Sequence, residues 1–358
     1  MILYRQRYAL PTILSWRAYT SSMSINSKDV HETIKMNSDG GGRNVDAIVT
    51  TSSDNSSSYP YLFDRDIVVH SLGGKDSNRF TSFVTDNWSV GDAPNGGYLM
   101  SIAIAAVQRT TKFKDPLSVS AYYTSKSVEN ESLDIEVTTL STSRSSSVIQ
   151  IGFKQLGILR CQFIGTFGDF TSLKGVDYGA LIAPQLPPIE KCINSSEIIL
   201  KALGGMNSLS KNISFLSPPD DPLVVGCLHG RRDDVSSASI SCWVRFEDGR
   251  LPCVLSSSFF LDALPPPILS AVSSNWVPTF EYNVHFWSQP INELPTDTDH
   301  TTTSCTVNGS VRWLRCRFHT PFVLRGMLYT DGELWDEDGK TLLATSRQLA
   351  RVLTNIKN

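Results

Sequence analysis

The residue of this chain with the clearest chemical potential is Asp262. It interrupts an apolar run, Phe259-Phe260-Leu261-Asp262-Ala263-Leu264, which three prolines follow. A carboxylate in apolar surroundings is costly unless it is paired or takes part in a reaction. Burial and a place near the carbonyl end of a helix would each raise the pKa of Asp262, which makes it a candidate general base. The alternative is a structural, partly exposed aspartate beside a proline turn.

Two polar residues further along the chain could hold a water molecule for this base. Thr279 opens a predicted strand, and its hydroxyl can both donate and accept a hydrogen bond. Regular alternation places Thr279 opposite the apolar face of that strand, which consists of Phe280, Tyr282, Val284 and Phe286. Gln348 lies on the small, apolar side of a second predicted strand, where a buried amide needs partners. Structural roles, as a common strand residue and as a partner of strand backbone, are the alternatives for Thr279 and Gln348.

A glycine pair precedes a fully apolar run of helical length. The segment Pro94-Asn95-Gly96-Gly97-Tyr98 opens the run 99–107, which predicts a buried helix. Glycine allows close backbone approach, and N–H groups near a helix start can bind an anion. We therefore predict that Asn95, Gly96, Gly97 and Tyr98 contact a substrate, and that the Gly96-Gly97 backbone stabilises a developing oxyanion.

The order of predicted elements occurs twice, which indicates an α+β protein with an internal duplication. A strand at 79–84 and the helix at 99–107 precede predicted strands at 117–125, 132–141, 147–155 and 160–167. A strand at 238–247 and a buried helix at 253–264 precede predicted strands at 279–287, 310–317, 324–330 and 342–353. The octet 116–123 can be aligned with 278–285, and each octet follows the helix of its half.

Four segments are predicted along the chain. Residues 1–60 are rich in Ser, Asn and Gly and form a disordered or targeting extension, followed by an N-terminal half at 61–170. Residues 171–235 contain several prolines and are interpreted as a linker with one short helix at 197–203, and residues 236–358 form the C-terminal half.

The first 28 residues carry four basic and no acidic side chains, which fits a mitochondrial transit segment. The alternative is an irregular extension or a start codon placed upstream of Met23 or Met36. We therefore expect a cytoplasmic or mitochondrial location.

Composition narrows the classes of partner. The formal net charge of −3 argues against nucleic acid, which favours a basic surface. No apolar run approaches the roughly 18 residues needed to span a bilayer. Seven cysteines at irregular spacing, without a CxxC pair, give little support to a metal site and are typical of a reducing compartment.

With these motifs in a duplicated frame, the chain resembles the double-hotdog acyl-CoA thioesterases, which include bacterial acyl-CoA thioesterase II. The resemblance covers roughly residues 75 to 354, omitting most of the linker, and rests on residues 94–98, on Asp262-Ala263-Leu264-Pro265-Pro266-Pro267, and on Thr279 and Gln348. It implies two hotdog folds in tandem, each an antiparallel sheet wrapped around a long central helix. It also implies one site per chain, because the first predicted helix contains no acidic residue.

The activity implied by this resemblance is hydrolysis of acyl-CoA to free fatty acid and CoA. Asp262, Thr279 and Gln348 match the family's catalytic residues and would activate a water molecule without a metal or other cofactor. The resemblance also implies a homodimer or higher homo-oligomer. Two alternatives stay open on the same fold: a non-catalytic acyl-CoA-binding or scaffold protein, and another reaction such as hydration of an enoyl thioester.

Overall fold

The computed structural model describes residues 59–74, 77–202, 208–229, 238–272, 276–290 and 313–353. All of them belong to one compact unit, Asp54–Asn358. The predicted N-terminal extension, apart from residues 59 and 60, lies outside the described residues. The mitochondrial interpretation therefore stays a prediction.

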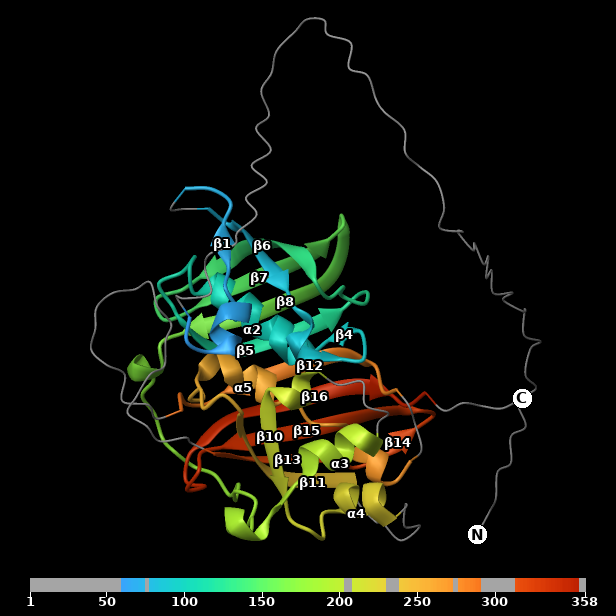
Figure 1. Ribbon diagram of the computed structural model, residues 1–358. Helices are drawn as coiled ribbons and strands as arrows, with labels where there is room; N and C mark the ends of the chain where they lie inside the picture. The colour runs from blue at the N-terminus through green and yellow to red at the C-terminus, as the bar shows by residue number, and fades with distance from the viewer. Residues whose placement is uncertain are drawn as a thin grey trace, which may run out of the picture. The chain divides into compact units, whose positions relative to one another are not determined.

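Fourteen strands within the described ranges form one antiparallel sheet, in the order β1-β2-β6-β7-β8-β5-β12-β16-β15-β13-β11-β10-β9, with β14 beside β15 (Figure 1). The N-terminal half supplies β1 (His70–Ser71), β2 (Arg79–Val84), β5 (Asp115–Tyr123), β6 (Glu131–Thr142), β7 (Ser147–Gln155) and β8 (Ile158–Gly168). The later part of the chain supplies β9 (Ile193–Asn194), β10 (Ile213–Ser217), β11 (Ala238–Phe246), β12 (Thr279–Phe286), β13 (Leu314–Thr320), β14 (Val323–Leu324), β15 (Met327–Trp335) and β16 (Leu342–Arg351). A separate hairpin joins β3 (Ser89–Val90) to β4 (Ala93–Pro94).

The two halves meet where β5 pairs with β12 in the middle of the sheet. Val119 pairs with Val284 and Ala121 with Tyr282, and all four side chains are buried. These two strands contain the octets that the sequence aligns with each other. The repeated segment of each half therefore lies against its own counterpart, which makes the two small sheets one continuous sheet.

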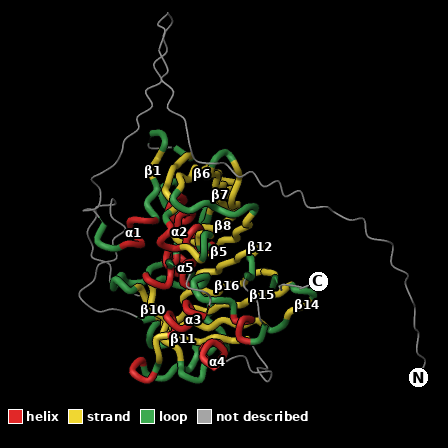
Figure 2. The backbone as a smooth tube through the Cα atoms, turned by 45° about the vertical axis from the view of Figure 1, so that its right-hand side comes forward, coloured by secondary structure: helices red, strands yellow, loops and turns green. Residues whose placement is uncertain are grey.

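Two helices pack against this sheet and contact each other: α2 (Gly96–Val107) and α5 (Val254–Phe260). Figure 2 shows α2 directly above α5, beside strands of both halves. Ten of the twelve residues of α2 are buried, as its uniformly apolar sequence predicts. The other helices are α1 (Leu62–Asp66), α3 (Ser195–Ala202), α4 (Pro222–His229) and short 3₁₀ turns at Asp86–Trp88, Phe170–Ser172, Ile189–Lys191, Leu209–Lys211 and Pro267–Ser270.

An aromatic cluster joins the halves beneath α5. Phe63 and Trp88 come from the N-terminal half, and Phe246, Phe259 and Phe260 from the C-terminal half. The Phe259 ring centroid lies 5.0 Å from that of Trp88 and 5.3 Å from that of Phe63. Such buried ring contacts stabilise the fold between the two halves, which share the main hydrophobic cluster.

The second buried helix is shorter than predicted. The sequence analysis places it at 253–264, whereas α5 ends at Phe260 and a turn carries Asp262. The three prolines at 265–267 explain the early end, because proline lacks an N–H donor and disfavours helical backbone in the preceding residue. Asp262 therefore follows the helix and is not part of it.

The segment 171–235 contains more than the single helix predicted for a linker. It includes β9, β10 and α4, and β10 pairs with β11 as part of the main sheet. The signal of β10 was weak because the strand has five residues and two prolines follow it directly. Nearer the C-terminus, Arg325 and Gly326 have positive φ angles and form the tight turn between β14 and β15.

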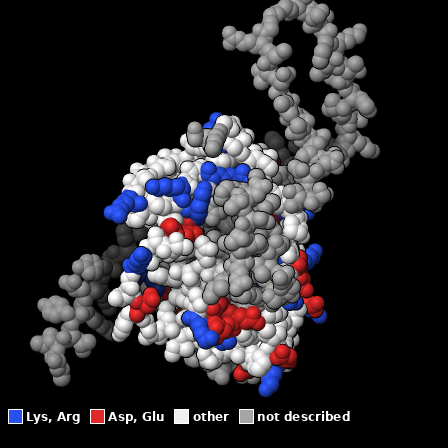
Figure 3. Space-filling model, turned by 90° about the vertical axis from the view of Figure 1, so that its left-hand side faces the viewer, with Lys and Arg blue, Asp and Glu red and all other residues white. Residues whose placement is uncertain are grey.

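The surface carries small groups of both charges. In the face drawn in Figure 3, basic side chains gather toward the top, and an acidic group with basic neighbours lies lower down. Within the described ranges, no helix is long and apolar enough to cross a membrane.

Candidate active site

A cavity of about 510 Å³ opens between the two halves of the sheet. In the N-terminal half its walls come from the β3–β4 hairpin, the start of α2 and the end of β5. In the C-terminal half they come from the proline segment after α5, the start of β12 and the later part of β16. Most of its lining is apolar. The polar side chains that reach it include Asn95, Tyr123, Asp262, Thr279, Thr330 and Gln348.

The carboxylate of Asp262 is held by donors from both halves. Gln348 Nε2 donates to Oδ1 at 2.5 Å, and the backbone N–H of Gly97 donates to Oδ2 at 2.8 Å. Asn95 Nδ2 donates to the Asp262 backbone carbonyl at 2.7 Å, while Asn95 Oδ1 caps α2 by accepting from Tyr98 N. The orientation of the carboxylate is thus fixed by a helix start, a strand and a capping side chain.

Burial raises the pKa of Asp262 to about 6. The hydrogen bonds from Gly97, Gln348 and the neighbouring backbone act in the opposite direction because they favour the anion. The sequence analysis also expected the carbonyl end of a helix to raise this pKa. The structure corrects the second cause: the carboxylate faces the amino end of α2, which stabilises a negative charge. Desolvation alone therefore accounts for the upward shift.

The two glycines of α2 are required by close contact with the segment that carries Asp262. A Cβ at Gly97 would collide with the Ser258 carbonyl and would lie 2.9 Å from both Phe259 Cα and Asp262 Cβ. A Cβ at Gly96 would collide with the Tyr123 hydroxyl and lie 3.0 Å from Asp262 Oδ2. Only glycine lets the start of α2 come close enough for the Gly97 N–H to reach the carboxylate.

Replacement of Gly97 by alanine is expected to lower the free energy of unfolding by about 1–3 kcal/mol, because backbone atoms cannot move aside cheaply. Urea unfolding measures the change. Gly152→Ala in β7 is the matched control, since the nearest atom to its added Cβ would be 3.8 Å away. Equal stability of the two variants would show that the helix start is not so tightly packed.

Gln348 fulfils the geometry that its sequence position predicts. It lies in β16 with Ala344, Ser346 and Ala350 toward the interior, and it pairs in register with Tyr282 of β12. Its amide nitrogen bonds Asp262, so its partner is the candidate base, not strand backbone. The Tyr282 hydroxyl donates to Ser258 O at 2.7 Å and so fixes the end of α5 beside it.

Thr279 lines the same cavity as Asp262 and Gln348. The predicted alternation fails at this end of β12, where the pairing with β16 shifts between Thr279 and Glu281. The irregularity turns Phe280 out of the core, and its side chain is 44% exposed. Phe280 was predicted to belong to the apolar face, and it instead lines the cavity next to Thr279.

The predicted substrate contacts divide into two groups. Asn95 and Gly96 line the cavity. Tyr98 is fully buried, and its hydroxyl donates to Asp66 O at 2.8 Å, so it does not fit the predicted role. The Gly97 N–H is occupied by Asp262 and is not directed at a substrate oxygen. The Gly96-Gly97 backbone therefore positions the base, and the oxyanion role predicted for it lacks support.

Tyr123 is a cavity residue that sequence reasoning missed. It ends β5 and lies on the same inward side as Val119 and Ala121, with its hydroxyl beside Gly96. The signal was present in the aligned octet 116–123, where a period of two separates inward Tyr123 from Tyr122, which is 46% exposed.

Comparison with protein families gives two successive matches along the chain. Residues 84–168 match the model of the acyl-CoA thioesterase N-terminal domain, and residues 207–352 match that of the acyl-CoA thioesterase C-terminal domain. The second match begins before β10, in agreement with the strand pairing described above. No curated protein sequence matched the chain.

Solved structures show the same fold. A protein assigned as a thioesterase II from Thermobifida fusca YX is 21% identical, with a TM-score of 0.65 over 82% of this chain and 98% of that one. A hotdog-fold protein of unknown function from Alicyclobacillus acidocaldarius is 16% identical, with a TM-score of 0.64 over 83% and 99%. Acyl-CoA thioesterase II TesB2 from Mycobacterium marinum is 14% identical, with a TM-score of 0.52 over 83% and 98%.

At these identities the structural likeness shows the fold alone, a hotdog-type arrangement of a large antiparallel sheet and few helices. The two family matches together span most of the described chain, in the order N-terminal domain and then C-terminal domain. The chain therefore belongs to the acyl-CoA thioesterase family and carries both of its domains in one polypeptide.

Proposed function

We propose that this protein is a tandem double hotdog that hydrolyses acyl-CoA thioesters to free fatty acid and CoA. The observation that carries the proposal is Asp262, a carboxylate with a pKa of about 6 that lines a mainly apolar cavity and is oriented by Gln348 and Gly97. The apolar lining would take the acyl chain, and the polar end would take the thioester group.

The proposed reaction begins with a water molecule between Asp262, Thr279 and Gln348. Each carboxylate oxygen of Asp262 accepts one protein hydrogen bond and retains a further acceptor position for the water. Asp262 takes a proton while the water oxygen bonds the thioester carbon, which gives a tetrahedral oxyanion. Collapse of the oxyanion breaks the C–S bond, and the proton passes from Asp262 to the departing sulfur. The products are a carboxylic acid and a thiol.

Thr279 and Gln348 would orient the water in this scheme. The Gln348 amide nitrogen is bound to Asp262, which leaves its carbonyl oxygen to accept from the water. The Thr279 hydroxyl, on the cavity wall, can accept a second water hydrogen or donate to the water oxygen. Such positioning lowers the barrier because the nucleophile is aligned before the reaction starts.

The test is thiol release from short-, medium- and long-chain acyl-CoAs by the full chain, measured by a thiol reagent. Turnover on at least one chain length supports the proposal. Loss of the conjugated double bond of an enoyl-CoA without thiol release would favour hydration. Saturable binding of acyl-CoA by a folded protein that turns over none of these substrates would favour a binding protein.

The pH dependence follows from the pKa of Asp262. A general base acts in its unprotonated form, so the active fraction of the enzyme falls as the pH drops below that pKa. We expect kcat/KM to rise about tenfold per pH unit below pH about 6 and to level off above it. A pH–rate profile of the wild-type protein on its best acyl-CoA checks this. A profile that is flat through this region would contradict Asp262 as the base.

A further inference from the structure

The hydroxyl of Tyr123 is a buried polar group without a partner. Its oxygen is shielded from solvent and makes no hydrogen bond with any described residue. Tyr123 is the last residue of β5, in the N-terminal half. Its hydroxyl lies against Gly96 at the polar end of the cavity. The carboxylate of Asp262 is close enough to raise the pKa of Tyr123 further, beyond the effect of burial.

An unsatisfied buried hydroxyl costs about 1–3 kcal/mol, so its place needs an explanation. The Asp262 carboxylate takes hydrogen bonds from Gln348 and from Gly97, and none joins it to the Tyr123 hydroxyl. Phenylalanine would fill the same space without this cost. A ligand oxygen that enters the cavity would provide the missing acceptor.

The reaction described above also lacks a donor. An oxyanion needs a hydrogen bond aimed at it, and the Gly97 N–H, which the sequence suggested, is directed at Asp262. Among the polar groups on the cavity wall near Asp262, Tyr123 offers an O–H that no described residue occupies. Burial raises the pKa of Tyr123 well above its usual value, so the hydroxyl remains protonated and can donate throughout the working pH range.

We infer that the Tyr123 hydroxyl donates a hydrogen bond to the carbonyl oxygen of the bound acyl thioester and stabilises the oxyanion that forms there. This inference rests on the proposed thioesterase function. Tyr123 keeps its proton throughout: the water proton goes to Asp262 and then to the departing sulfur, and the donor only lowers the energy of the charged intermediate. The C-terminal half would then supply the general base, after α5, and the N-terminal half would supply the oxyanion donor, on β5.

The test is Tyr123→Phe, which removes one oxygen and preserves the ring. We expect kcat to fall about 10²- to 10³-fold, the range for loss of one oxyanion donor, with KM changed by less than about threefold. The melting temperature should stay the same or rise, because the variant removes an unsatisfied buried hydroxyl. A purely structural tyrosine would give the opposite result, with lower stability and little change in kcat.

Tyr122→Phe is the matched control, because Tyr122 precedes Tyr123 on β5 and projects to the opposite, outer side. Its kcat should equal that of the wild-type protein. Retention of wild-type kcat by Tyr123→Phe would overturn the inference, and so would a loss shared equally by both variants.

A second measurement separates this inference from the proposed function. In the Asp262→Asn background, which should stall hydrolysis, the infrared band of bound [1-¹³C]octanoyl-CoA reports the hydrogen bond at the carbonyl. We expect the band to shift to lower frequency than in solution, and the shift to be lost when Tyr123→Phe is added. A shift that depends on Tyr123, without turnover by the wild-type protein, would contradict the proposed hydrolysis and support the contact between Tyr123 and the carbonyl oxygen. Turnover with an unshifted band, or no bound label, would refute the contact.

Discussion

Asp262→Asn is expected to lower kcat/KM on acyl-CoA by about 10²- to 10⁴-fold, the scale for loss of a general base. Asparagine has nearly the shape of aspartate, and its carbonyl oxygen can still accept from the Gly97 N–H. The Gln348 amide can turn to present its oxygen to the new NH₂ group. The cavity should therefore keep its form while the proton acceptor is lost.

The stability of the same variant distinguishes a catalytic loss from a folding defect. Burial disfavours the Asp262 anion, as the raised pKa shows, so a neutral side chain should fold equally well or better at neutral pH. Steady-state thiol release and thermal unfolding of Asp262→Asn give the two quantities. Asp134→Asn is the control, because Asp134 is exposed on β6 and is not among the residues that line the cavity. Undiminished hydrolysis by Asp262→Asn would assign the base to another group.

Much of the fold is encoded in local periodicity. The strands β2, β7, β11 and β12 and the helix α2 begin or end within about three residues of their predicted bounds, because alternating or uniformly apolar sequence has one dominant packing solution. The later strand β15 runs on to Trp335, beyond its predicted end, with Asp331 and Glu333 on one side and buried Leu334 on the other. Charged side chains that alternate with buried ones concealed its second half.

The candidate site was predictable in part as a set of residues, with Tyr98 wrongly included and Tyr123 missed, but not as an arrangement. The isolated carboxylate of Asp262 and the inward amide of Gln348 were both recognisable, and the structure joins them by a hydrogen bond. The contact of Asp262 with Gly97 depends on the antiparallel approach of α2 and α5, which no local pattern specifies. The irregular start of β12 is likewise a tertiary effect, which is why the side predicted for Phe280 was wrong. The homodimer stays a prediction.

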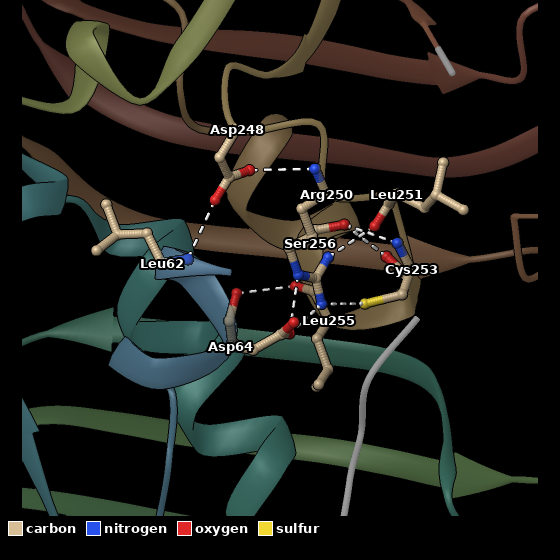
Figure 4. A network of polar contacts seen from close by, with 9 residues as sticks. Leu62, Asp64, Asp248, Arg250, Leu251, Cys253, Leu255 and Ser256 are labelled. Carbon is tan, nitrogen blue, oxygen red and sulfur yellow. Dashed lines mark hydrogen bonds and ion pairs between the residues drawn. The ribbon is translucent and has the colours of Figure 1, made fainter. Parts of the chain in front are cut away.

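The second large effect is expected at a buried ion pair outside the cavity. Arg250 and Asp64 are 2% and 5% exposed, and Arg250 donates from Nε and Nη2 to Asp64 Oδ1 at 2.8 and 2.6 Å. Figure 4 shows the guanidinium between α1 and the start of α5, where it also contacts the Leu251 carbonyl and Cys253 Sγ. The pair ties the first helix of the N-terminal half to the helix that precedes Asp262.

Asp64→Ala is expected to lower the free energy of unfolding by about 3–5 kcal/mol, because it leaves the buried guanidinium without its carboxylate. The Phe63 and Phe246 rings, 5.1 and 5.2 Å from the guanidinium carbon, cannot replace the lost charge. Asp331→Ala is the control: its partner Arg347 is exposed, and loss of a surface pair should cost less than about 1 kcal/mol. Urea unfolding of both variants measures the difference.

The double variant Asp64→Leu/Arg250→Met tests why the single change is costly. If the penalty comes from an uncompensated buried charge, removal of both charges should restore most of the lost stability, since apolar side chains of similar size can replace a buried pair. If it comes from lost packing, the double variant should be at least as unstable as Asp64→Ala. The first outcome would also predict wild-type thiol release by the double variant, because α1 would still support α5 through the contact of Phe63 with Phe259.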